Sequence, residues 1–104
     1  MKEWEVIFSD IAEAELDDID FYISSVLLEP KTAEKQVFRI LDNVQSLKNM
    51  PERYPLYKIE PWRSRGVRTL TVDNYVVFYH TVSATGEVFI DHIFYGGRDI
   101  ERLM

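Results

Sequence analysis

Four arginines in the second half of the chain are the first residues to consider as a functional group. Arg63 and Arg65 precede a predicted strand, Arg68 opens it, and Arg98 follows the last strand, close to Tyr95. If these strands are antiparallel neighbours, Arg68 and Arg98 would approach one edge of a sheet beside Tyr95. Guanidinium forks and an aromatic ring suit phosphate and base contacts. They suit an acidic protein partner equally well, and ordinary surface arginines paired with carboxylates are a third interpretation.

The two histidines are weaker candidates for catalysis. Histidine is a frequent general acid or base because its ordinary pKa lies near neutrality. His80 and His92 both fall within predicted strands, and Asp91 is the carboxylate next to His92. Adjacent strand residues point to opposite faces of a sheet, so we expect no Asp91–His92 pair. A structural or surface role is favoured for both histidines.

Three carboxylates of the first predicted helix, Glu13, Asp17 and Asp20, are spaced to share one face. Such a group could bind a divalent cation, but no histidine or second ligand cluster accompanies it. A solvated acidic face is therefore favoured, and no metal is predicted. No cofactor is predicted either, because Gly96-Gly97 lacks the helix-opening pattern of a phosphate-binding loop.

The length and composition predict one globular domain that spans residues 1–104. Hydrophobic residues make up 46% of the chain and cysteine is absent, which fits a reducing compartment. We find no signal peptide and no apolar run of membrane-spanning length, and expect a cytoplasmic protein without a membrane partner. The net charge of −6 argues against nucleic-acid binding, which depends on cations facing phosphates. Residues 53–104 carry seven basic and six acidic side chains, so a local cationic site is possible there.

A short strand and two amphipathic helices are predicted in the first half. Glu3–Phe8 suits the strand, and Ser9 suits the N-cap of the first helix. Pro30 separates the two helices and fits the first turn of the second. Apolar residues recur at steps of three and four in both, at Ala12, Leu16, Ile19, Ile23 and Val26, and at Ala33, Val37, Ile40, Val44 and Leu47. Two such helices with a short connection predict an antiparallel hairpin.

Three strand patterns follow an irregular segment at residues 51–66. They cover residues 67–72, 75–79 and 87–95, with turn residues between them. Residues 75–79 are apolar on both faces, so this strand should lie in the middle of the three. The expected fold is α+β in the order β-α-α-β-β-β: a short first strand, then an antiparallel helix hairpin packed on an antiparallel sheet of three further strands.

Several short segments keep a recognisable order and spacing along nearly the whole chain. They are Asp10–Leu16, Tyr22-Ile23, Ala33, Leu47 with Pro51, Val67–Leu70, Tyr75–Tyr79 and Tyr95–Asp99. In this arrangement the chain resembles the toxin superfamily named for RelE and ParE. The resemblance implies a bacterial toxin of a type II toxin–antitoxin module, associated with growth inhibition and plasmid stabilization. Such a toxin is held inactive by a cognate antitoxin.

The resemblance implies one of two mechanisms. RelE-like members cleave mRNA in the ribosome with several basic residues and often a C-terminal tyrosine, whereas ParE-like members inhibit DNA gyrase and lack that set. RelE-like toxins typically carry an arginine just after the tyrosine that matches Tyr75, and this chain has Val76 there. Arg68 and Arg98 match two other basic positions, and the catalytic tyrosine would fall near Met104.

The resemblance therefore favours the ParE-like branch, a toxin that inhibits DNA gyrase by binding rather than by catalysis. The candidate contact residues are Arg63, Arg65, Arg68, Tyr95 and Arg98. One alternative is a ribosome-dependent mRNA endonuclease that uses Arg68 and Arg98 with Tyr95 or His92. Another is a member that has lost toxicity and only pairs with its antitoxin. A homodimer is left open.

Overall fold

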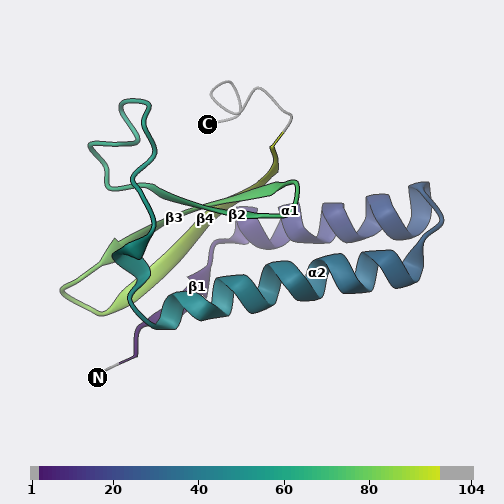
Figure 1. The fold of residues 1–104 in the computed structure, drawn as a ribbon, viewed down its shortest axis with the longest axis horizontal. Helices are drawn as coiled ribbons and strands as arrows, with labels where there is room; N and C mark the ends of the chain where they lie inside the picture. The colour runs from purple at the N-terminus through teal and green to yellow at the C-terminus, as the bar shows by residue number, and fades with distance from the viewer. Residues whose placement is uncertain (1–2, 97–104) are drawn as a thin grey trace.

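The computed structural model describes residues 3–96, in which two helices cover one face of a four-stranded sheet (Figure 1). The elements are, in chain order, β1 (Glu5–Phe8), α1 (Asp10–Phe21), α2 (Pro30–Gln45), β2 (Arg68–Val72), β3 (Tyr75–Val82) and β4 (Glu87–Tyr95). A single π-helical turn, Tyr22–Val26, extends α1, and 3-10 turns at Ser46–Lys48 and Pro51–Arg53 follow α2. The predicted α+β order β-α-α-β-β-β is confirmed.

The sheet is mixed, with the strand order β1-β4-β3-β2. The last three strands are antiparallel neighbours, and β3 lies between the other two, as its two apolar faces predict. β1 is added in parallel on the other side of β4, and its last residue, Phe8, is opposite Ile90. From Asp91 onward, β4 therefore has a neighbouring strand on one side only.

Local sequence signals set the ends of the helices. The Ser9 hydroxyl accepts a hydrogen bond from the Ala12 N–H, which satisfies one free donor at the start of α1. Pro30 lies in the first turn of α2, as predicted. Figure 1 shows the connected ends of the two helices extending beyond the sheet. Within residues 3–96, neither helix has the length and apolar content needed to cross a membrane.

The apolar stripe predicted for the first helix ends earlier than expected. Ile23 is 7% exposed, whereas Val26 is 56% exposed. In the π turn the Leu27 N–H bonds to the Tyr22 carbonyl, five residues back, instead of the four residues of an α-helix. The wider turn shifts the phase of the helix, so the regular spacing no longer places Val26 on the buried face.

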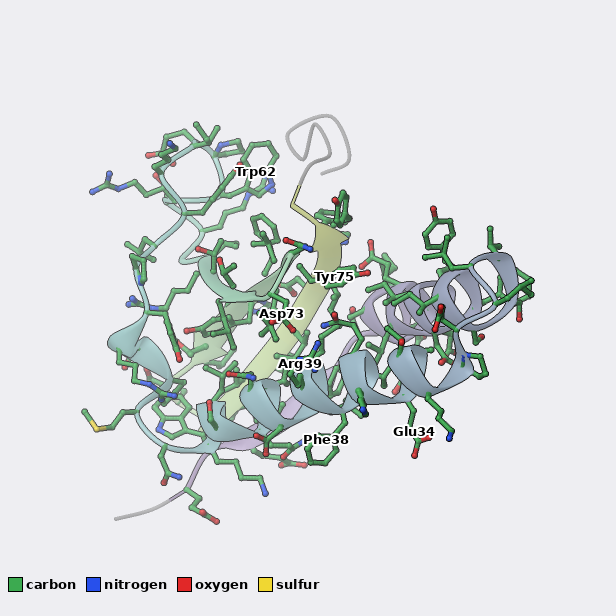
Figure 2. The ribbon with its side chains drawn as sticks, turned by 45° about the vertical axis from the view of Figure 1, so that its right-hand side comes forward. Glu34, Phe38, Arg39, Trp62, Asp73 and Tyr75 are labelled. Atoms are coloured by element: carbon green, nitrogen blue, oxygen red, sulfur yellow. The ribbon has the colours of Figure 1, made fainter. Side chains whose placement is uncertain are left out.

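A charged contact ties α2 to the turn between β2 and β3 (Figure 2). Asp73 occupies this turn with a positive φ of 54°. Its carboxylate accepts hydrogen bonds from Arg39 at 2.7 Å and from Gln36 at 3.0 Å. These two bonds, chiefly the one from Arg39, hold the pKa of Asp73 below its usual value.

The sheet has a hydrophobic core on each face. The larger core lies under the helices and includes Ala12, Ile40, Val44, Leu47, Leu70, Val72, Val77, Tyr79, Val88, Ile90 and Ile93. The smaller core is formed by Val67, Phe78 and Phe94, with Tyr57, Trp62 and Val76 packed against it. Because only one irregular segment covers this second face, part of it stays open.

Candidate functional site

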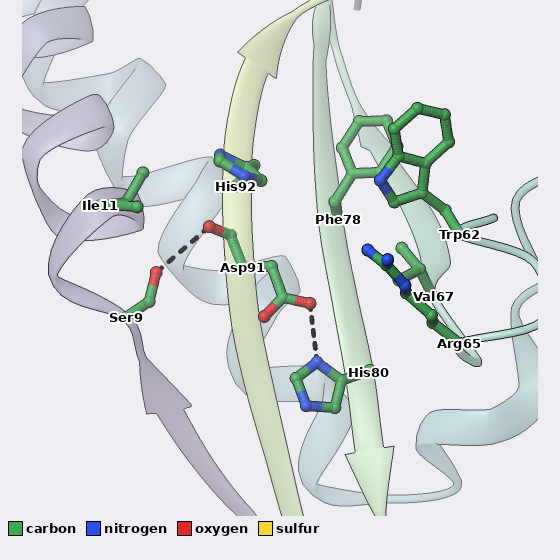
Figure 3. A pocket seen from close by; sticks show the side chains of 9 residues that line it. All are labelled: Ser9, Ile11, Trp62, Arg65, Val67, Phe78, His80, Asp91 and His92. Atoms are coloured by element: carbon green, nitrogen blue, oxygen red, sulfur yellow. Dashed lines mark hydrogen bonds and ion pairs between the residues drawn. The ribbon is translucent and has the colours of Figure 1, made fainter. Parts of the chain in front are cut away.

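A groove of about 500 Å³ opens on the sheet face that the helices leave bare (Figure 3). The start of α1 and the turn before β2 form its sides, and β3 and β4 form its floor. Its lining residues are Ser9, Ile11, Trp62, Arg65, Val67, Phe78, His80, Asp91 and His92. Two imidazoles, a carboxylate, a guanidinium and an indole thus meet in one place, which makes the groove the candidate site.

Asp91 and His92 both reach the groove because β4 is irregular at this point. Phe78 pairs with His92 and Tyr79 pairs with Ile90, so Asp91 is an extra residue in the strand. Such a β-bulge disturbs the alternation and allows successive side chains to lie on one face. The expectation that Asp91 and His92 point to opposite faces is wrong, because it assumed a regular strand.

The bulge gives His80 a carboxylate partner on the neighbouring strand. His80 Nδ1 and Asp91 Oδ2 lie 2.7 Å apart (Figure 3). An ionised carboxylate only accepts hydrogen bonds, so Nδ1 is the donor. The His80 ring also stacks on Phe89, with 5.3 Å between the ring centroids. His80 is thus fixed in orientation, and its Nε2 has no hydrogen-bond partner in the described part of the chain.

Glu15 of α1 positions His92 in a similar way. The Glu15 carboxylate oxygens lie 3.3 and 3.4 Å from His92 Nδ1, and the His92 ring stacks on Phe94 with 4.7 Å between centroids. Glu15 also accepts the backbone N–H of Ile93 at 3.0 Å. Ile93 belongs to the part of β4 that β1 leaves unpaired, so Glu15 satisfies a donor that would otherwise need a strand or water.

Arg65 is the cation of the groove. Its backbone N–H bonds to the Pro61 and Trp62 carbonyls, which fixes the turn that carries it. Its side chain makes no hydrogen bond or ion pair with the rest of residues 3–96. A free guanidinium near an indole can bind an anionic group and stack on a planar ring, and the two imidazoles can exchange protons.

Two other predicted contact residues, Arg63 and Arg68, do not line the groove. The Arg68 side chain is 19% exposed. Its guanidinium donates to the Tyr54 carbonyl at 2.6 Å and lies 3.9 Å from the Glu52 carboxylate. Arg68 therefore holds the irregular segment against the sheet. Arg63 is exposed and does not line the groove, and Arg98 lies outside the described residues.

Tyr95, the remaining candidate, is far from Arg68. Arg68 pairs with Tyr79 at the start of β2, whereas Tyr95 pairs with Tyr75 at the end of β4. The expected approach of Arg68 to Tyr95 is wrong, because their partners on β3 are four residues apart and β3 lies between their strands. Tyr95 is 50% exposed and meets Tyr75 edge-on at 5.8 Å. Burial chiefly raises the pKa of Tyr75, and the nearby Tyr95 and Tyr22 phenols raise it further.

Some acidic residues of α1 face solvent, and one faces the sheet. Glu13, Asp17 and Asp20 are exposed, and within residues 3–96 no group of three or more His, Asp or Glu side chains is arranged to hold a metal ion. Glu15 faces the sheet instead, and sequence reasoning missed it. It also missed the His80–Asp91 pair.

Comparison with known proteins identifies related structures. A structure of the chromosomal ParDE toxin–antitoxin system from P. aeruginosa aligns with a TM-score of 0.73 and 26% identity, over 89% of this chain and 96% of that chain. The RelBE2 toxin–antitoxin complex from Mycobacterium tuberculosis aligns with a TM-score of 0.64 and 15% identity, over 89% of this chain and 98% of that chain. At 15% identity, the alignment with the RelBE2 complex shows a shared fold only. No curated protein matches the chain.

A family model gives the decisive match. The model describes the ParE toxin of the type II toxin–antitoxin system parDE, and it matches residues 6–100. That range takes in the helix hairpin, all the strands after it and the groove. The resemblance found in the sequence is thereby confirmed, and the chain belongs to the ParE toxin family of type II toxin–antitoxin systems.

Proposed function

We propose that this chain is a cytoplasmic toxin that binds and inhibits DNA gyrase and is neutralised by a cognate antitoxin. The observation that carries the proposal is the family match over residues 6–100. The structure from a ParDE system supports the same branch at 26% identity, whereas the RelBE2 complex, at 15%, supports the fold alone.

The residues at the positions singled out by the resemblance favour binding over RNA cleavage. Val76 takes the place of an arginine and packs against the small core with Phe78 and Phe94. Arg68 is bonded to the Tyr54 carbonyl and only 19% exposed. Stabilising the charge on a transferring phosphate requires preorganised cations, and neither position supplies one to solvent.

The open sheet face supports an antitoxin contact. Phe78 and Val67 give the groove an apolar floor, and the Arg65 guanidinium at its side lacks a partner within the described residues. An antitoxin segment with an apolar side chain next to a carboxylate would bury ring surface and pair with Arg65. Segments that fold on binding can cover such a surface.

The proposal is tested by inducing the chain alone and together with the antitoxin encoded by the neighbouring reading frame. We expect growth arrest in the first case and normal growth in the second. Purified toxin should inhibit DNA supercoiling by gyrase, and equimolar antitoxin should restore it. Normal growth with folded toxin alone would indicate a non-toxic, antitoxin-binding member. Full gyrase activity with excess folded toxin would exclude this target.

One observation favours a second candidate function, ribosome-dependent mRNA cleavage. His80 and His92 lie on neighbouring strands and line the same groove. Arg65 lines the same groove. One imidazole would take the 2′-OH proton as the 2′ oxygen bonds to phosphorus, and the other would protonate the 5′ oxygen as its bond to phosphorus breaks. Arg65 would stabilise the charge on the phosphate oxygens.

Primer extension on translated mRNA separates the two candidates. New codon-positioned ends that vanish in His80→Ala and in His92→Ala would favour cleavage. An SOS response without such ends would favour gyrase inhibition. Arg68→Ala serves as a further check, because a nuclease that depended on Arg68 would lose activity while a folded gyrase inhibitor would keep it.

A further inference from the structure

The connected end of the helix hairpin carries a concentrated group of exposed apolar side chains. This hairpin tip consists of Phe21, Tyr22, Val26, Leu27 and Leu28, whose exposed fractions run from 51% to 78%. Figure 1 shows this end of the hairpin projecting past the sheet. Single exposed apolar residues are ordinary, but a contiguous group marks an interaction surface.

Of the tip residues, Leu28 contributes least to the packing of the chain. It is 78% exposed, so burial contributes little to its presence. Its φ of 58° lies in the left-handed region, which glycine and asparagine adopt more readily than leucine. A leucine here strains the backbone without filling a core. Its side chain therefore serves something other than the stability of the isolated chain.

The tip is bordered by negative charge. Asp17 and Asp18 lie one turn before Phe21 and Tyr22, and both are exposed. No lysine or arginine occurs from Glu3 to Glu29, and residues 17–35 together carry five carboxylates against Lys31 and Lys35, a balance of −3. An apolar surface with a carboxylate border is complementary to an apolar groove bordered by lysine and arginine.

We propose that the hairpin tip docks into such a groove, bordered by cationic side chains, on the protein that the toxin inhibits. The inference rests on the proposed function, since it names the surface through which the toxin meets its target. A second copy of this chain is a poor occupant, because contact between two tips would bring like charges together. The antitoxin has a separate candidate surface around Arg65, on the open face of the sheet.

The sharpest test replaces Leu28 with asparagine, which tolerates the left-handed backbone and removes the apolar side chain. Met50→Asn is the matched control. Met50 also has a positive φ, 48°, and is 63% exposed, but it follows the far end of α2. The two variants and the unaltered chain are compared for inhibition of gyrase supercoiling and for affinity to the antitoxin.

We expect Leu28→Asn to raise the toxin concentration for half-inhibition about tenfold or more, as the loss of a central apolar anchor does. Met50→Asn should change it by less than about twofold, as an ordinary surface substitution does. Antitoxin affinity should stay within about twofold for both. The Asp17→Asn/Asp18→Asn double variant should bind gyrase more slowly at low salt, with the difference disappearing at high salt.

Each contrary result has a distinct meaning. Equal inhibition by Leu28→Asn and the unaltered chain overturns the inference and leaves the proposed function standing. No inhibition by the unaltered chain overturns the proposed function, and the inference with it. If Leu28→Asn weakens antitoxin binding as much as it weakens gyrase inhibition, the tip binds the antitoxin and the inference is overturned. If the unaltered chain forms a dimer that Leu28→Asn alone dissociates, the tip is a dimer contact and the inference is also overturned. If circular dichroism shows Leu28→Asn unfolded, Leu28→Gly takes its place with the same expectations.

Discussion

The groove and the hairpin tip are organised in opposite ways. In the groove, polar side chains hold one another, His80 with Asp91 and His92 with Glu15. At the tip, the five apolar side chains belong to neither core and are more than half exposed. The polar side chains of the groove maintain the local fold. The apolar side chains of the tip are exposed and do not contribute to either core.

This difference indicates which substitutions separate folding from function. A change at a groove carboxylate breaks hydrogen bonds on which the sheet depends. A change at the tip leaves the packing of both cores intact. Arg65 is the exception within the groove, because its side chain makes no contact of this kind among the described residues. The following changes test the contrast.

The largest effect is expected beneath the groove, at Tyr79 of β3. Its side chain is fully buried, and its hydroxyl donates to the Pro51 carbonyl at 2.6 Å. Tyr79→Phe leaves that buried carbonyl unpaired, so the free energy of unfolding should fall by about 1–3 kcal/mol. Urea unfolding at pH 7 measures the change. An unchanged midpoint and slope would show that this part of the sheet tolerates a missing hydrogen bond.

The same residue predicts sensitivity to alkali. Burial raises the pKa of Tyr79 from 10.0 to about 12. The unfolded chain therefore loses this proton first, and stability declines as the pH rises from about 10 towards 12. Tyr79→Phe should lack this part of the decline in unfolding series recorded from pH 9 upward. Identical declines in both proteins would contradict the prediction.

A smaller effect is expected at the edge of the groove, where two glutamates of α1 provide a matched pair. Glu15→Ala removes the acceptor for the Ile93 N–H and the partner of His92, and should cost about 1–2 kcal/mol. Glu13→Ala, at an exposed position, should stay within about 0.5 kcal/mol. Thermal and urea unfolding of both variants measure the difference. Equal costs would mean that the Glu15 contacts do not stabilise the sheet.

The smallest effect, of opposite sign, is expected at the tip. Leu28→Gly removes left-handed strain from a leucine with φ of 58°, and should raise the free energy of unfolding by up to about 1 kcal/mol. Leu27→Gly is the control, since Leu27 has an ordinary φ of −85°, and should lower it by about 0.5–1 kcal/mol. The same sign for both glycine variants would remove the argument that Leu28 is strained.

The fold was largely predictable because local signals and the hydrophobic pattern agree. Ser9 caps α1, Pro30 opens α2, and the apolar faces of β3 place it between its neighbours. The exception is Val26, where the predicted helix changes to a π turn. The spacing of apolar residues does not encode the hydrogen bond from the Leu27 N–H to the Tyr22 carbonyl that forms this turn.

The site was much less predictable, because it depends on register. The positions of Arg68 and Tyr95 in the sequence do not reveal that antiparallel pairing separates them. The structure shows the irregularity in its core: Ile90 and Ile93 both face the main core although they are three residues apart. Strict alternation would put them on opposite faces. The pairing of His80 with its carboxylate follows from that one irregularity.

Because of the bulge, the polar lining of the groove could change without altering which β4 side chains face each core. Without Asp91, β4 would alternate regularly, with the side chains of one face at Val88, Ile90 and Ile93 and those of the other at Phe89, His92 and Phe94. A deletion of this one codon would therefore keep every apolar residue on its own face. Asp91, the carboxylate that orients His80, is thus one residue whose loss would leave the two faces of β4 as they are.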